Sequence, residues 1–120
     1  MATESIYAGV AGMTWNVVTG TSASMDVMNG YIPNNIALVT LTLPTVAAVG
    51  DIIRIIGKGS GLWRVAQNAS QQIVLGESAT TLGITGYIEA TKKRDSVDLI
   101  CTEANVEFSI SDSVGNLTFV

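Results

Sequence analysis

The side chains that most often carry out catalysis are scarce in this chain of 120 residues. Histidine is absent, which removes the commonest general base and the commonest metal ligand. Carboxylates remain, but they fall in turns and at outward positions of the expected strands: Asp26, Asp51, Glu77, Glu89, Asp95, Asp98, Glu103, Glu107 and Asp112. We therefore expect a non-enzyme with no catalytic residue, no metal site and no cofactor. An enzyme that uses paired carboxylates is an alternative, and it would need two carboxyls facing each other at about 5–10 Å.

The glycine-rich run Gly57–Gly61 (GKGSG) invites comparison with a phosphate-binding loop. It does not match the P-loop pattern, because Lys58 is followed by Gly59 where Ser or Thr is required. It also joins two expected strands, so no helix N-terminus is available to hold an anion. The run is typical of a hairpin turn. Lys58 and Arg64 remain candidates for an anion or sugar contact near it.

Trp63 is the second feature with binding potential, since Arg64, Gln67 and Asn68 follow closely in WRVAQN. A sugar ring stacks on an aromatic face while amide side chains bind its hydroxyls. Lys58, Trp63, Arg64, Gln67 and Asn68 are therefore the candidate ligand-binding residues. The alternative is that Trp63 belongs to the core or to a subunit interface.

Short alternating segments must position these residues. In IALVTLTL, Val39 and Leu41 share one face and Thr40 lies opposite, as in a half-buried strand. Similar segments separated by turn residues recur along the chain, at about nine or ten places, without a helical pattern. We expect an all-β domain over residues 14–120, an antiparallel β-sandwich or jelly-roll-like fold, preceded by a lead-in or linker at residues 1–13.

The composition limits the possible partners. Hydrophobic residues make up 48% of the chain and charged residues only 13%, about half the usual charged share. Surfaces that pack against identical copies are depleted of charge, so this composition favours a homo-oligomer. The net charge of −4 and the scattered basic residues argue against nucleic-acid binding. No segment has the pattern of a signal peptide or of a membrane span, so we expect no membrane insertion.

Several strings are more specific than this general pattern: LTLP, AAVGD, IIGKGSGLW followed by AQN, DSVDLIC and the closing VGNLTFV. With the sequence between them, they resemble a module of phage tail-fibre-like and bacterial surface-associated proteins, over about residues 15–120. Leu62 stands where the resemblance leads us to expect a glycine.

The resemblance implies a β-structured homotrimer that serves as an attachment head on a virion tail fibre or a bacterial cell surface. Its partner would be a cell-surface glycan or protein receptor. A carbohydrate-binding, lectin-like module is the alternative function.

Overall fold

The chain forms two mixed β-sheets. The computed structural model describes residues 3–8 and 13–120, and these residues contain strands and no helix. In spatial order, the larger sheet contains β1 (Thr3–Ala8), β2 (Thr14–Val18), β4 (Asn29–Pro33), β6 (Ile52–Ile56), β11 (Ser96–Glu103), β12 (Glu107–Val114), β8 (Gln72–Leu75) and β9 (Ser78–Ala79). The smaller sheet contains β13 (Thr118–Phe119), β10 (Tyr87–Glu89), β7 (Trp63–Ala66), β5 (Val39–Thr42) and β3 (Ser22–Ser24).

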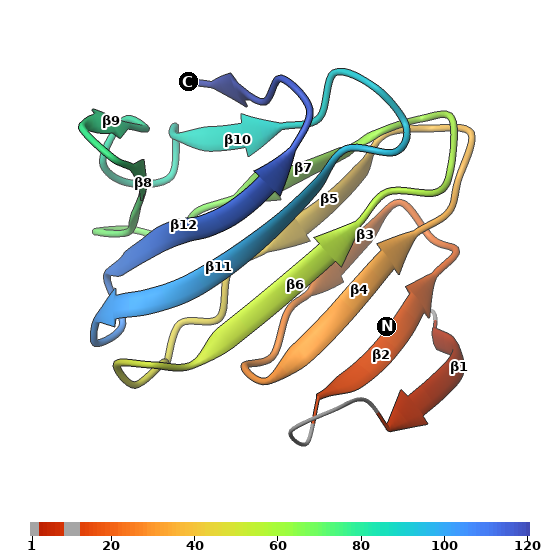
Figure 1. The fold of residues 1–120 in the computed structure, drawn as a ribbon, viewed down its shortest axis with the longest axis horizontal. Helices are drawn as coiled ribbons and strands as arrows, with labels where there is room; N and C mark the ends of the chain where they lie inside the picture. Colours follow the sequence, from red (N-terminus) through yellow and green to blue (C-terminus); the bar gives the residue numbers. More distant parts are fainter. Residues whose placement is uncertain (1–2, 9–12) are drawn as a thin grey trace.

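The first half of the chain winds in coils, and each coil contributes one strand to each sheet. β2 and β3 form the first coil, β4 and β5 the second, and β6 and β7 the third. Successive coils pair in parallel, β2 with β4 and β4 with β6 in one sheet, and β3 with β5 and β5 with β7 in the other. Figure 1 shows the larger sheet in front of β3, β5 and β7.

On the side of the third coil, both sheets continue with antiparallel strands, except that β8 pairs in parallel with β12. β11 pairs with β6, and β12 pairs with β11, while β10 pairs with β7 and β13 with β10. The prediction of an all-β fold is confirmed, but the prediction that the sheets are antiparallel is wrong for the coiled half. Alternation of apolar residues with period two is the same in parallel and antiparallel strands, so it could not distinguish them.

The core lies between the two sheets and is built from the inward positions of the alternating strands. β5 and β7 contribute Val39, Leu41, Trp63 and Val65, and all four side chains are fully buried. The opposite sheet contributes the following buried residues: Val18, Tyr31, Ile53, Ile55, Val97, Leu99, Cys101 and Phe108. Each large apolar side chain buried in this way contributes about 1.5–3 kcal/mol relative to an exposed one. The predicted inward face of Val39 and Leu41 is confirmed.

The glycine-rich run is a crossing between sheets and not the expected hairpin, since β6 and β7 belong to different sheets. The run stacks directly on the loop of the preceding coil: the backbone NH of Gly61 donates to the carbonyl of Asn35 at 3.0 Å. A Cβ atom at Gly59 would meet the backbone of Asn35, and one at Gly61 would meet the backbone of Ala37. Glycine is needed here because two backbones touch.

Leu62, where a glycine was expected from the resemblance, has a φ of 69°. This left-handed conformation is one that glycine adopts at little cost, whereas other residues lose about 1–2 kcal/mol. The side chain of Leu62 packs against the core, and this contact offsets part of the cost.

Part of the expected lead-in belongs to the sheet. Residues 3–8 form β1, which pairs antiparallel with β2, and the remaining lead-in positions before residue 13 lie outside the described residues. In the described part of the chain, no helix has the length and apolar character needed to cross a membrane.

Replacing Gly61 by alanine tests the stacking of the coils. We expect Gly61→Ala to lower the free energy of unfolding by about 3 kcal/mol, because the added methyl group overlaps the backbone of Ala37. Ser60→Ala, at an exposed position of the same loop, should change it by less than about 0.5 kcal/mol. Urea unfolding followed by circular dichroism measures both. Equal stabilities of the two variants would contradict the stacking argument.

Cys101 is a free, fully buried cysteine. Burial raises the pKa of its thiol. This effect is larger than the opposite effect of hydrogen bonds with the backbone of Asn105 and Glu103. Because the thiolate is the reactive species, we expect an aromatic disulfide reagent at pH 8 to modify Cys101 only after the chain unfolds in denaturant. Rapid stoichiometric labelling of the native protein, followed by its absorbance, would show that the thiol is accessible.

Candidate ligand-binding site

The structure places the predicted candidate Trp63 in the core. Its ring is fully buried, and its indole NH donates to the backbone carbonyl of Asp95 at 3.0 Å. The prediction that Trp63 offers a ring face to a sugar is therefore wrong for this conformation. The alternative reading, that Trp63 belongs to the core, is correct. Its indole holds the loop before β11 against β7.

Gln67 is also buried, with 4% of its surface exposed. Its amide nitrogen lies 2.8–2.9 Å from the carbonyl oxygens of Gln71, Thr81 and Gly83, and its amide oxygen accepts a hydrogen bond from the hydroxyl of Thr80. These bonds connect the 81–86 loop to the end of β7, and one of them supplies a donor to the carbonyl of Thr81. Gln67 therefore holds a loop in place and has no amide group free for a ligand.

Gln71 plays a similar part on the other side of the same turn. Its amide nitrogen donates to the carbonyls of Pro44 at 2.8 Å and Asn105 at 3.0 Å, and its oxygen accepts from the backbone NH of Asn68 at 2.8 Å. The amides in AQNASQQ thus replace regular strand pairing where three loops meet. A ligand-binding interpretation and a loop-holding role require the same residue types, so the sequence pattern alone could not separate them.

The two basic candidates lie apart from each other. Arg64 projects from the outer face of the smaller sheet, forms an ion pair with Glu89 at 2.7 Å, and lies 3.8 Å above the ring of Tyr87. Lys58 is exposed in the loop before β7, whereas Asn68 follows β7 at its other end. The five predicted residues therefore do not form one site.

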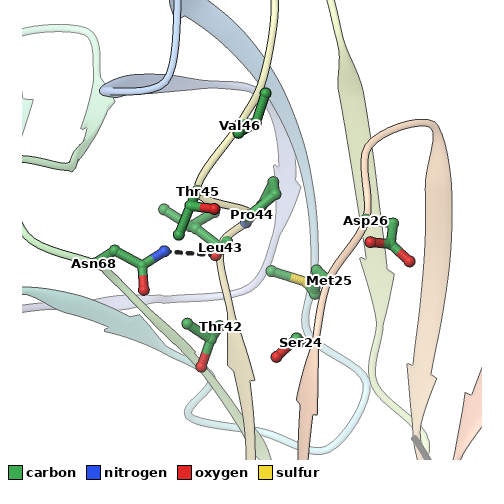
Figure 2. Close-up of a pocket in the computed structure, with 9 residues that line it drawn as sticks. All are labelled: Ser24, Met25, Asp26, Thr42, Leu43, Pro44, Thr45, Val46 and Asn68. Carbon is green, nitrogen blue, oxygen red and sulfur yellow. Dashed lines mark hydrogen bonds between the residues drawn. The ribbon is translucent and has the colours of Figure 1, made fainter.

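A depression of about 310 Å³ lies where the parallel strands β3, β5 and β7 reach their carboxyl ends. Figure 2 shows its lining: Ser24, Met25, Asp26, Thr42, Leu43, Pro44, Thr45, Val46 and Asn68. Of the predicted residues, only Asn68 takes part. The other polar members, Ser24, Asp26, Thr42 and Thr45, were missed because the parallel pairing that joins their segments leaves no local mark in the sequence.

Hydrogen bonds fix the walls of this depression. The amide nitrogen of Asn68 donates to the carbonyl of Leu43 at 2.7 Å, and its amide oxygen points away from that carbonyl (Figure 2). The backbone NH of Asp26 donates to the hydroxyl of Tyr31 at 2.6 Å. Tyr31 is fully buried, and this burial is the main cause that raises the pKa of its hydroxyl. The segment that carries Asp26 is therefore anchored from the core.

The depression continues into a row of hydroxyl groups on the outer face of the smaller sheet. Ser22 pairs with Thr40 and Ser24 with Thr42 across β3 and β5. Thr40 is next to Arg64 in the ladder. These polar side chains point away from the core, so Ser24 and Thr42 belong to both the depression and the flat face beside it.

The lining combines the groups that bind a polyhydroxylated ligand. The lining residues include three hydroxyls, one carboxylate and one amide, together with Met25 and Leu43, which are buried. A carboxylate and an amide oxygen accept hydrogen bonds from sugar hydroxyls, and apolar side chains contact the C–H face of a sugar ring. Asp26 is the one carboxylate among the lining residues, so this site lacks the paired carboxylates that glycoside hydrolysis uses. In residues 3–8 and 13–120, no group of three or more acidic or cysteine side chains is arranged to hold a metal ion.

No protein-family model and no curated protein matches this chain.

Replacing Gln67 tests its loop-holding role. We expect Gln67→Met to lower the free energy of unfolding by about 2–3 kcal/mol, because the side chain loses its hydrogen bonds to three carbonyls and to the hydroxyl of buried Thr80. Amide hydrogen exchange in residues 80–86 should also become faster. Gln72→Met is the matched control, since the half-buried side chain of Gln72 donates a single hydrogen bond, to the carbonyl of Thr80. Its loss should cost about 1 kcal/mol or less. Equal effects of the two substitutions would contradict the role given to Gln67.

Proposed function

We propose that this chain is a non-enzymatic attachment module of the tail-fibre-like or adhesin-like kind, assembled as a homotrimer and located on a virion or a bacterial cell surface. The proposed receptor is a surface glycan, which is a polyhydroxylated ligand. The sequence resemblance and the low share of charged residues support the module and the oligomer. Repetition of one weak site around a symmetry axis raises the overall affinity for a surface that carries many copies of the ligand.

The observation that supports a glycan receptor is the depression between the ends of β3, β5 and β7. Its volume is at the lower end of the range for small-molecule sites, about 300–1,000 Å³, which suits one or two sugar units. Asp26, Thr42 and Asn68 offer acceptors and donors together with the buried Met25 and Leu43. Of the ligand-binding residues predicted from the sequence, Asn68 is retained as a contact residue, whereas Trp63 and Gln67 are not.

Glycan binding provides the test. We expect the protein to bind at least one class of structure on an array of bacterial-surface and host glycans. Asp26→Asn should weaken that binding by about tenfold or more, because a charge-assisted hydrogen bond contributes about 1.5–3 kcal/mol. Glu77→Gln, an exposed acid in the turn between β8 and β9, removes the same charge elsewhere and should leave binding unchanged. An array without signal, or equal binding by both variants, would rule out the glycan site.

A further inference from the structure

The depression at the carboxyl ends of β3, β5 and β7 has a negative charge and no positive one. In the described part of the chain, Asp26 is the only charged residue that lines it. The ion pairs within residues 3–8 and 13–120 are those of Arg54 with Asp98 and of Arg64 with Glu89, so Asp26 takes part in neither. The carboxylate of Asp26 is therefore available to a cation that comes from outside the chain.

Backbone NH groups in the walls of the depression are already bound within the chain. Four of them donate to acceptors at 2.6–3.0 Å: those of Met25, Asp26, Leu43 and Asn68. The side-chain amide nitrogen of Asn68 donates to the carbonyl of Leu43, and Pro44 has no NH group. A carboxylate or phosphate on a ligand needs NH donors or a cation. The donors that remain on the lining side chains are mainly the hydroxyls of serine and threonine, which carry no charge.

Acceptors are more plentiful than donors on the same side chains. An ionised carboxylate only accepts hydrogen bonds, and its two oxygens offer several positions for a donor. The amide oxygen of Asn68 points away from the Leu43 carbonyl that its nitrogen binds. In the view of Figure 2, Asn68 and Asp26 lie at opposite sides, with Ser24 and Thr42 between them. A ligand that fills the depression thus meets acceptors on both sides and a negative charge on one.

The backbone of Asp26 is held in place from the core, while its side chain reaches solvent. Its NH group donates to the hydroxyl of Tyr31, whose ring is fully buried. The preceding residue, Met25, is also buried. A fixed backbone reduces the ordering that binding requires. The Asp26 side chain is exposed, so a ligand can reach it and water also weakens any ion pair that it forms.

We propose that the depression binds a sugar with a protonated amino group, an unacetylated hexosamine unit, with its ammonium group against Asp26. This inference rests on the glycan site of the proposed function and names the class of glycan. An ammonium group has three N–H donors and no acceptor, which complements a lining rich in acceptors. Charge-assisted hydrogen bonds are roughly twice as strong as neutral ones. A sugar carboxylate in the same position would be repelled by Asp26.

An N-acetylated hexosamine is the competing ligand. Its acetamide has one N–H donor for Asp26, and its methyl group could contact Val46, a lining residue that is 75% exposed. The acetamide is neutral, however, and leaves the negative charge of Asp26 without a partner. The amine and the acetamide therefore differ in the one property that the lining selects, which is charge.

Binding of four tetramers with one type of backbone tests the proposal. The probes are the β-1,4-linked tetramers of glucosamine, N-acetylglucosamine, glucose and glucuronic acid, titrated by calorimetry at low ionic strength. We expect the glucosamine tetramer to bind about fivefold more tightly than the N-acetylglucosamine tetramer, a ratio that allows for the exposure of Asp26. The glucuronic acid tetramer should bind more weakly than the glucose tetramer.

Two variants separate a local effect from the overall charge of the protein, which is −4. Asp26→Asn should reduce the fivefold preference for the amine to about one, because it removes the charge and keeps the shape of the side chain. Glu77→Gln removes one negative charge at an exposed position outside the depression, and it should retain the preference. Circular dichroism verifies that both variants are folded.

The outcomes distinguish this inference from the proposed function. Equal or tighter binding of the N-acetylglucosamine tetramer, a preference that survives Asp26→Asn, or an equal loss of preference in both variants would overturn the amine assignment. So would binding on the glycan array that is confined to neutral or acidic sugars, although the glycan site would then stand. An array without signal, together with no binding of any tetramer, would overturn both.

Discussion

The contact on which this structure most depends is the backbone-to-backbone stacking of the second and third coils. Gly59 and Gly61 lie against the backbone of Asn35 and Ala37, and this contact sets the separation and register of β5 and β7. The register aligns Thr40 with Arg64 and Leu41 with Val65. One row of side chains therefore fills the core while the next row faces outward. The polar outer face and the depression at its end are consequences of this stacking.

Several amide and aromatic side chains are used inside the molecule. Trp63 and Gln67 have the chemistry of a sugar site, yet both bind backbone carbonyls of neighbouring loops. A small fold with long crossings between sheets has many backbone groups outside regular ladders, and buried groups of this kind need partners. The polar residues that remain available for a ligand, such as Asp26 and Thr42, lie where strands end.

Alternation along the strands was sufficient to predict the all-β class and the inward face of Val39 and Leu41. It could not predict the pairing direction, because Val39 and Leu41 would point inward in either arrangement. The candidate site was mostly beyond prediction: Asn68 was identified from its residue type, whereas Ser24 and Thr42 meet through a parallel pairing of segments 18 residues apart. A tryptophan in a chain with few aromatics suggested a site, but its size favoured the core.

The antiparallel pairing of β11 with β6 also affects how the chain folds. Coils pair over separations of about 15–24 residues, whereas Ser96 and Ile56 are 40 residues apart in the sequence, and closure of the longer loop has the larger entropic cost. A chain with formed coils and an undocked β11 presents a free strand edge of the sequence IIRII. Apolar edges of this kind template aggregation, and a central charge interrupts them. Arg54 is such a central charge, and it therefore opposes aggregation of the partly folded chain through the free edge of β6.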